Sequence, residues 1–248
     1  MLIDVHAHSL VGDFVNRDEV VLRAIDTYNV DKIYISNLCA AIPTEDEVTF
    51  VNNQTAELMK KAPGRIGGYV YISPEHKNAV DVLKKGIEEQ GFEGVKFWIS
   101  AYCDDPVCNK TVEKMIDYGV PLLLHAFHKA VGQLPYETTG EHVANLAKRY
   151  PELKIIMAHL GGNCYHGIPA IRDLENVWVD FSGSSYRADE LPYTIENVGT
   201  DRILFGTDCP IGYTASLGQL EEIELSDDDR DKICYKNALK IFDRSFRL

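Results

Sequence analysis

The chain has 248 residues and a formal net charge of −13, and 25% of its residues are charged. This composition is ordinary for a folded protein, and its acidity argues against nucleic-acid or anionic-membrane partners, which are bound by clustered Lys and Arg. The sequence shows no signal-peptide pattern and no apolar run of bilayer length. We therefore expect a single cytoplasmic domain over residues 1–248 that acts on a small molecule, with a homodimer as the default assembly.

Short β-branched and aromatic runs alternate with longer amphipathic stretches along the whole chain, which is typical of repeated βα units. Eight runs have this character: 2–8, 31–37, 65–73, 93–100, 120–126, 153–159, 176–182 and 202–208. Eight such repeats predict a (β/α)₈ TIM barrel, with a last helix over 228–246 closing the fold. A doubly wound open sheet is the alternative, although no Gly-x-Gly-x-x-Gly motif follows the first run.

Two histidines end the first run, His6 and His8. Residues two apart in a strand point to the same side, so both imidazoles face one way. Paired neutral imidazoles suit a divalent cation, most often zinc. On its own this spacing is weak evidence, because His-x-His also occurs by chance.

Four later runs also end in residues that bind metals or transfer protons: Lys96, His125, His159 and Asp208. Each has an ordinary structural interpretation, as a snorkelling lysine, a hydrogen-bonded core histidine or a turn-capping aspartate. Active sites of these barrels lie at the C-terminal ends of the strands, so all of these polar groups would meet at one mouth. Burial without partners is costly there, and a metal ion would satisfy them together.

The ordered motifs resemble those of a known family. They are Val5-His6-Ala7-His8, Gly94-Val95-Lys96, His125, Met157 through Gly162, and Gly206-Thr207-Asp208, with Thr138 through Glu152 leading into the fourth. The set is similar to the amidohydrolase superfamily, in the amidohydrolase-related branch that contains enzymes like aminocarboxymuconate-semialdehyde decarboxylase. The resemblance runs through the whole chain in motif order.

This resemblance implies a distorted (β/α)₈ barrel with His6, His8 and Asp208 on a first divalent metal. In binuclear members a carbamylated lysine matching Lys96 bridges to a second metal, held by the matches of His125 and His159. In mononuclear members the match of His125 binds the single ion, and the match of His159 polarises the substrate or assists proton transfer. The sequence contains the residues for either arrangement.

Such a site is expected to activate water. A zinc-like ion, one or two per chain, acidifies bound water, and the resulting hydroxide would attack an amide, lactone or ester carbonyl. Asp208 would carry the proton, and His159 or the metal would stabilise the oxyanion. The main expectation is thus a metal-dependent hydrolase. The alternatives are a metal-dependent non-oxidative decarboxylase and a non-catalytic barrel stabilised by zinc, although structural zinc sites usually have four protein ligands.

Substrate-binding candidates lie near the same strand ends. Trp98 could stack on a planar group, and Arg187, or Arg17 beyond the first run, could hold a carboxylate. Their ordinary alternatives are a packed aromatic side chain and solvated surface arginines.

Overall fold

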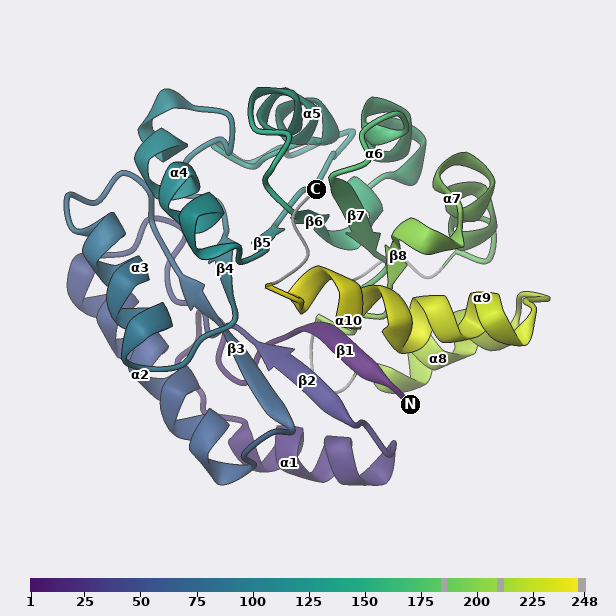
Figure 1. Ribbon diagram of the computed structural model, residues 1–248, viewed down its shortest axis with the longest axis horizontal. Coiled ribbons are helices and arrows are strands. Elements are labelled where there is room, and N and C mark those ends of the chain that lie inside the picture. The colour runs from purple at the N-terminus through teal and green to yellow at the C-terminus, as the bar shows by residue number, and fades with distance from the viewer. Residues whose placement is uncertain (184–186, 209–211, 245–248) are drawn as a thin grey trace.

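The computed structural model shown in Figure 1 describes residues 1–183, 187–208 and 212–244. It contains one sheet of eight parallel strands that pair in sequence order, which confirms the predicted barrel. The strands are β1 (Ile3–Ala7), β2 (Lys32–Ile35), β3 (Ile66–Tyr71), β4 (Gly94–Phe97), β5 (Leu122–Leu124), β6 (Ile155–Met157), β7 (Val177–Asp180) and β8 (Ile203–Leu204).

The first strand is hydrogen-bonded to the segment that follows β8, and these bonds close the ring of strands. The amide of Val5 donates to the carbonyl of Phe205 at 3.0 Å, and the amide of Thr207 donates to the carbonyl of His6 at 3.2 Å. The observed strands are shorter than the predicted runs, and β8 ends at Leu204 rather than at Asp208. The last residues of most runs therefore lie in loops at the barrel mouth, where their side chains can turn toward one another.

Helices surround the strands, as Figure 1 shows, and bury their apolar faces against the outside of the barrel. They are α1 (Asp18–Thr27), α2 (Glu45–Lys61), α3 (Ala79–Glu88), α4 (Asn109–Tyr118), α5 (Gly140–Arg149), α6 (Cys164–Ile171), α7 (Glu190–Val198), α8 (Tyr213–Glu221), α9 (Asp227–Asp231) and α10 (Asn237–Phe242), with short helices η1 (Pro106–Cys108), η2 (Ala158–Gly161), η3 (Thr200–Arg202) and η4 (Lys232–Lys236). Within the described ranges, no helix combines the length and apolarity needed to cross a bilayer.

The C-terminal helices close the end of the barrel opposite the mouth. Ser226 caps α9 by accepting from the amide of Asp229, and a π-helical turn then leads into α10. Phe242 stacks on Tyr34 with ring centroids 3.7 Å apart, and Ile241 packs among the inward side chains of the strands. In Figure 1 this helix lies across the barrel end. The expected closing helix is confirmed, and α10 ends at Phe242, whereas the predicted end at residue 246 lies outside the described residues.

Candidate active site

A β-bulge in the first strand turns its histidines toward the barrel interior. Asp4 pairs with Ile33 and Ala7 with Ile35, so β1 holds one more residue than β2 between these two pairs. Val5 packs with the inward side chains whereas Ala7 belongs to the outer core, so strict alternation would have turned His6 outward. The extra residue shifts the phase of the strand and places His6 on the inner side, a common use of bulges beside active sites.

The side chains of His6, His8 and Asp208 form a compact group at the barrel mouth. Asp208 Oδ1 lies 3.3 Å from His6 Nε2 and 3.2 Å from His8 Nε2. The opposite ring nitrogens are engaged, since His6 Nδ1 lies 3.0 Å from Asp180 Oδ2 and His8 Nδ1 donates to the carbonyl of Ser36. Acceptors at Nδ1 keep the protons there, so both Nε2 lone pairs face Asp208. Ligand atoms of His6, His8 and Asp208 all lie within 4.8 Å of one another, a donor set suited to a divalent metal.

The charges of this group also favour metal binding. Burial, helped by the nearby Lys96, lowers the pKa of His6 to about 3, so the imidazole is neutral and able to coordinate. Burial alone would raise the pKa of Asp180, but its interactions with His6, His159 and Ser182 outweigh this and hold the pKa well below its usual range. An ionised Asp180 is the acceptor that a ligating histidine needs at its second nitrogen.

Two of the site residues sit on strained backbone. His159 has a φ of 60° and Asp208 a φ of 67°, in the left-handed region that side chains with a Cβ atom rarely adopt. The neighbouring Leu160 has a φ of 51°. Buried contacts hold this conformation, since the amide of His159 donates to Asp180 Oδ1 at 3.1 Å. Strain of this kind concentrates at functional sites, where the surroundings fix a side chain in one direction.

His159, Lys96 and His125 surround the group. His159 Nδ1 lies 3.1 Å from the carbonyl of Ser182, and among the described residues no hydrogen bond occupies its Nε2. Lys96 Nζ lies 3.0 Å from His6 Nε2, and burial lowers the pKa of Lys96 to about 8. The ring of His125 lies 5.1 Å from that of His159, centroid to centroid. Among the described residues, His125 belongs to neither of the two close clusters of ligand atoms, which are His6, His8, Asp208 and His6, His159, Asp180.

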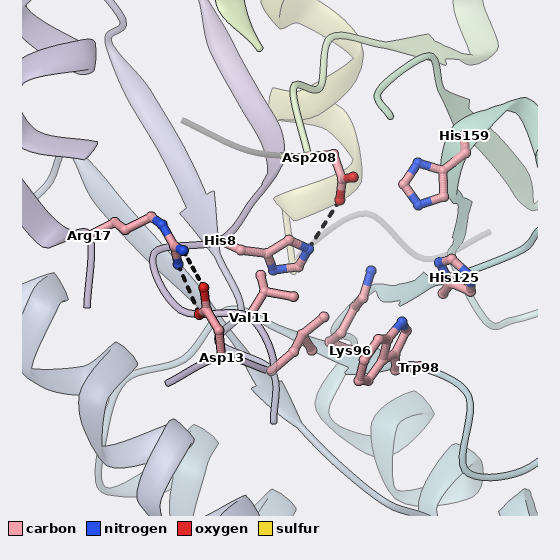
Figure 2. A pocket seen from close by; sticks show the side chains of 10 residues that line it. His8, Val11, Asp13, Arg17, Lys96, Trp98, His125, His159 and Asp208 are labelled. Carbon is pink, nitrogen blue, oxygen red and sulfur yellow. Dashed lines mark hydrogen bonds and ion pairs between the residues drawn. The ribbon is translucent and has the colours of Figure 1, made fainter. Parts of the chain in front are cut away.

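A pocket of about 490 Å³ opens onto these residues, and Figure 2 shows its lining. Asp208 keeps 35% of its side chain exposed, so the cluster has an open side, unlike a closed structural metal site. His6 is fully buried behind the lining. The lining combines polar groups of the site with apolar walls: His8, Val11, Asp13, Arg17, Leu38, Lys96, Trp98, His125, His159 and Asp208.

The predicted substrate-binding residues have different outcomes. Trp98 lines the pocket, as expected. Arg187 does not line it, and its side chain is 62% exposed and pairs with Asp189 at 2.9 Å. Arg17 lies at the pocket wall instead, where it pairs with Asp13, as Figure 2 shows. The structure therefore brings the arginine beyond the first strand to the site and leaves the one beyond the seventh on the surface.

Two carboxylates of the site were not among the candidates taken from the sequence. Asp180 ends β7, and its position at a strand end was a usable signal. Glu137 lies in the loop between β5 and α5, where its Oε1 is 3.2 Å from His125 Nε2. No motif or spacing in the sequence connects Glu137 with His125.

Comparison with known proteins identifies the family of this metal-site barrel. The family model described as amidohydrolase matches residues 39–244. A gamma-resorcylate decarboxylase from Polaromonas sp. is 31% identical over an alignment 280 positions long, which covers 89% of this chain and 86% of that protein. The chain belongs to the amidohydrolase family, which confirms the resemblance found in the sequence.

Solved structures share the fold at lower sequence identity. A 2,6-dihydroxybenzoate decarboxylase from Rhizobium has a TM-score of 0.79 and 21% identity, with 99% of both chains covered. A dihydroxybenzoic acid decarboxylase from Polaromonas sp., with bound manganese and 2-nitroresorcinol, has a TM-score of 0.78 and 20% identity, covering 99% of this chain and 97% of that one. The expectation of hydrolysis is wrong, because the relative that shares 31% identity with this chain is a decarboxylase.

Proposed function

We propose that this protein is a metal-dependent, non-oxidative decarboxylase of a small aromatic acid of the ortho-hydroxybenzoate class. The observation that carries the proposal is the 31% identity, over most of both chains, to a gamma-resorcylate decarboxylase. The proposal treats residues 1–248 as one catalytic domain, which the single eight-stranded sheet supports.

The residues present fit a divalent metal. His6, His8 and Asp208 would hold it through the atoms that already face one another, and His125 would add a fourth ligand from the pocket wall. Nitrogen-rich donors suit zinc, whereas the related Polaromonas structure contains manganese, so loading with both ions tests the identity. When bound, the ion would supply positive charge for the carboxylate and neighbouring hydroxyl of the substrate.

The pocket suits an aromatic acid. Val11, Leu38 and Trp98 give it apolar walls, against which a planar ring can pack. Lys96 and Arg17 add cationic groups, Lys96 deep beside His6 and Arg17 nearer solvent. For this reaction Lys96 is assigned as a free lysine that attracts the substrate carboxylate, rather than as the bridging carbamate of binuclear relatives. A bridging carbamate seen at Lys96 in a metal-loaded crystal would overturn this assignment.

Decarboxylation needs one proton at the ring carbon that loses the carboxylate. His159 is assigned as the donor, because Ser182 holds its Nδ1 and leaves Nε2 directed toward the pocket. Asp208 is assigned to accept the hydroxyl proton, which increases electron density at that carbon. His159, protonated on both ring nitrogens, gives its Nε2 proton to that carbon; the carbon–carboxylate bond then breaks, its electron pair stays with the ring, and carbon dioxide leaves. Asp208 returns its proton to the phenolate oxygen, and His159 takes a new proton from solvent.

The test is turnover of ortho-hydroxybenzoates by metal-loaded protein in heavy water. We expect release of carbon dioxide and deuterium at the vacated ring carbon, with no oxygen from labelled water in the organic product. Asp208→Asn should lose activity by at least about 100-fold, whereas Asp201→Asn, at an exposed aspartate, should keep it. Incorporation of labelled oxygen, or equal rates for Asp208→Asn and wild type, would overturn the proposal.

A further inference from the structure

Glu137 is a buried carboxylate in the loop between β5 and α5. Its side chain is only 2% exposed. Lys129 Nζ donates to both carboxylate oxygens, at 2.7 and 2.8 Å, and Gln133 Nε2 and the amide of Leu134 donate to Oε2 at 2.9 and 3.2 Å. The remaining contact is to His125 Nε2, 3.2 Å from Oε1. The carboxylate is thus fully engaged within the protein, which is how an ionised group persists when buried.

The loop that carries Glu137 is built around this carboxylate. Its two ends are joined where the amide of Phe127 donates to the carbonyl of Thr138 at 2.8 Å. Gln133 links its middle back to the carbonyl of Phe127, also at 2.8 Å. Because Lys129 and Gln133 hold both oxygens from within the loop, Oε1 is kept at a fixed place beside His125.

The contact with Glu137 determines which nitrogen of His125 carries the proton. The neutral imidazole that a metal ligand requires has a single N–H. An ionised carboxylate can only accept, so the proton lies on Nε2. Nδ1 then carries a lone pair, and no hydrogen bond occupies Nδ1 among residues 1–183, 187–208 and 212–244. His125 itself lines the pocket.

We infer that Glu137 is a positioning residue that fixes the tautomer and direction of His125, so that the Nδ1 lone pair is presented to the metal. This inference rests on the proposed function in one respect, the assignment of His125 as a metal ligand. Glu137, from a loop in which the sequence shows no motif, would thus join the residues that support the metal site. Partners of this kind orient ligating histidines, and their loss typically weakens metal binding about 10- to 100-fold.

The test compares Glu137→Ala and Glu137→Gln with His125→Ala and wild type in full-length protein. Mn²⁺ affinity is measured by calorimetry, and the tautomer of His125 by nitrogen NMR of metal-free protein. Glu137→Ala should weaken Mn²⁺ binding by about 10- to 100-fold and let the His125 proton distribute over both nitrogens. Glu137→Gln keeps the size and an acceptor oxygen, so it should fall between Ala and wild type. Glu141→Ala, at an exposed carboxylate four residues along the chain, is the matched control and should bind as wild type does.

Each result has a separate meaning. Wild-type affinity in both Glu137 variants, together with weak binding by His125→Ala, would overturn the positioning role and leave the proposed ligand set intact. Wild-type affinity in His125→Ala would overturn both. An Nδ1–H tautomer in the wild-type protein would also overturn the inference. Glu137→Gln keeps the test decisive if Glu137→Ala fails to fold, because it conserves the packing of the loop.

Discussion

Asp180→Asn tests whether the hydrogen bond to His6 prepares the metal site. The carboxylate accepts at Oδ1 from the amide of His159 and from the amide and hydroxyl of Ser182, at 3.1, 3.0 and 2.5 Å. An asparagine must keep its oxygen toward these three donors, so its NH₂ group would face His6 Nδ1. Two donors cannot share that contact, and His6 would be driven toward the tautomer with its proton on Nε2, where it cannot bind a metal.

The size of the loss in Mn²⁺ affinity depends on a second acceptor for the proton on His6 Nδ1. Ser182 Oγ lies 3.0 Å from His6 Nδ1 and can take over part of the role of the lost carboxylate oxygen. We therefore expect about a 10-fold loss of Mn²⁺ affinity for Asp180→Asn, at the low end of the usual range for such partners. Adding Ser182→Ala removes the substitute, and the loss should approach 100-fold, or about 2.7 kcal/mol.

The assay is calorimetric titration of metal-free protein with Mn²⁺, after circular dichroism shows that each variant is folded. Asp26→Asn is the matched control, since Asp26 is 72% exposed and pairs with Arg65 on the surface. If the folded double variant bound Mn²⁺ within about twofold of wild type, the tautomer argument would be refuted.

Three further predictions concern stability. Gly167→Ala places a Cβ atom 2.6 Å from the carbonyl oxygen of Leu160, so urea unfolding should show a loss of about 1–3 kcal/mol and turnover should fall; Gly218→Ala, with nothing within 4 Å of its Cβ, is the control, and equal losses in both would contradict this account. Hydrogen bonds to neighbouring hydroxyl groups lower the pKa of Asp229 to about 2. The folded state therefore binds this proton more weakly than the unfolded state, and the stabilisation, full above the usual pKa of 3.8, is lost as the pH falls toward 2. Asp229→Asn should thus be destabilised near pH 6 and less so near pH 3, and a pH-independent difference would argue against it. Mn²⁺ at about 100 times its Kd should raise the free energy of unfolding of wild type by about 2.7 kcal/mol but not that of His8→Ala, and equal increases would place the ion elsewhere.

The sequence predicted the barrel because its eight buried runs repeat with regular helices between them. It also located His6, His8, His159 and Asp208 at one mouth, since parallel strands bring their C-terminal ends together. It did not show how the histidines face inward. Alternation makes His6 and His8 point the same way. The bulge that turns them to the inner side depends on the pairing of β1 with β2, which the sequence of β1 alone does not reveal.

Residues outside the strands were harder to place. Arg17 and Arg187 each follow a predicted strand end in the sequence, but only Arg17 lies at the pocket, and the side chain of Arg187 is exposed. Glu137 was missed because its role depends on a folded loop that brings it to His125. The reaction was also misjudged, because water activation and decarboxylation use the same ligand types, and the choice between them depends on the substrate that the pocket admits.

The packing of α10 under the barrel has a consequence for the order of events in turnover. Ile241 and Phe242 fill the end opposite the mouth together with the inward strand residues, so the pocket is a blind chamber on that side. In the proposed decarboxylase, the acid and the phenol would both occupy the pocket that Arg17 and Trp98 line. The phenol must therefore leave before the next acid enters, and it should act as a competitive inhibitor of its own formation.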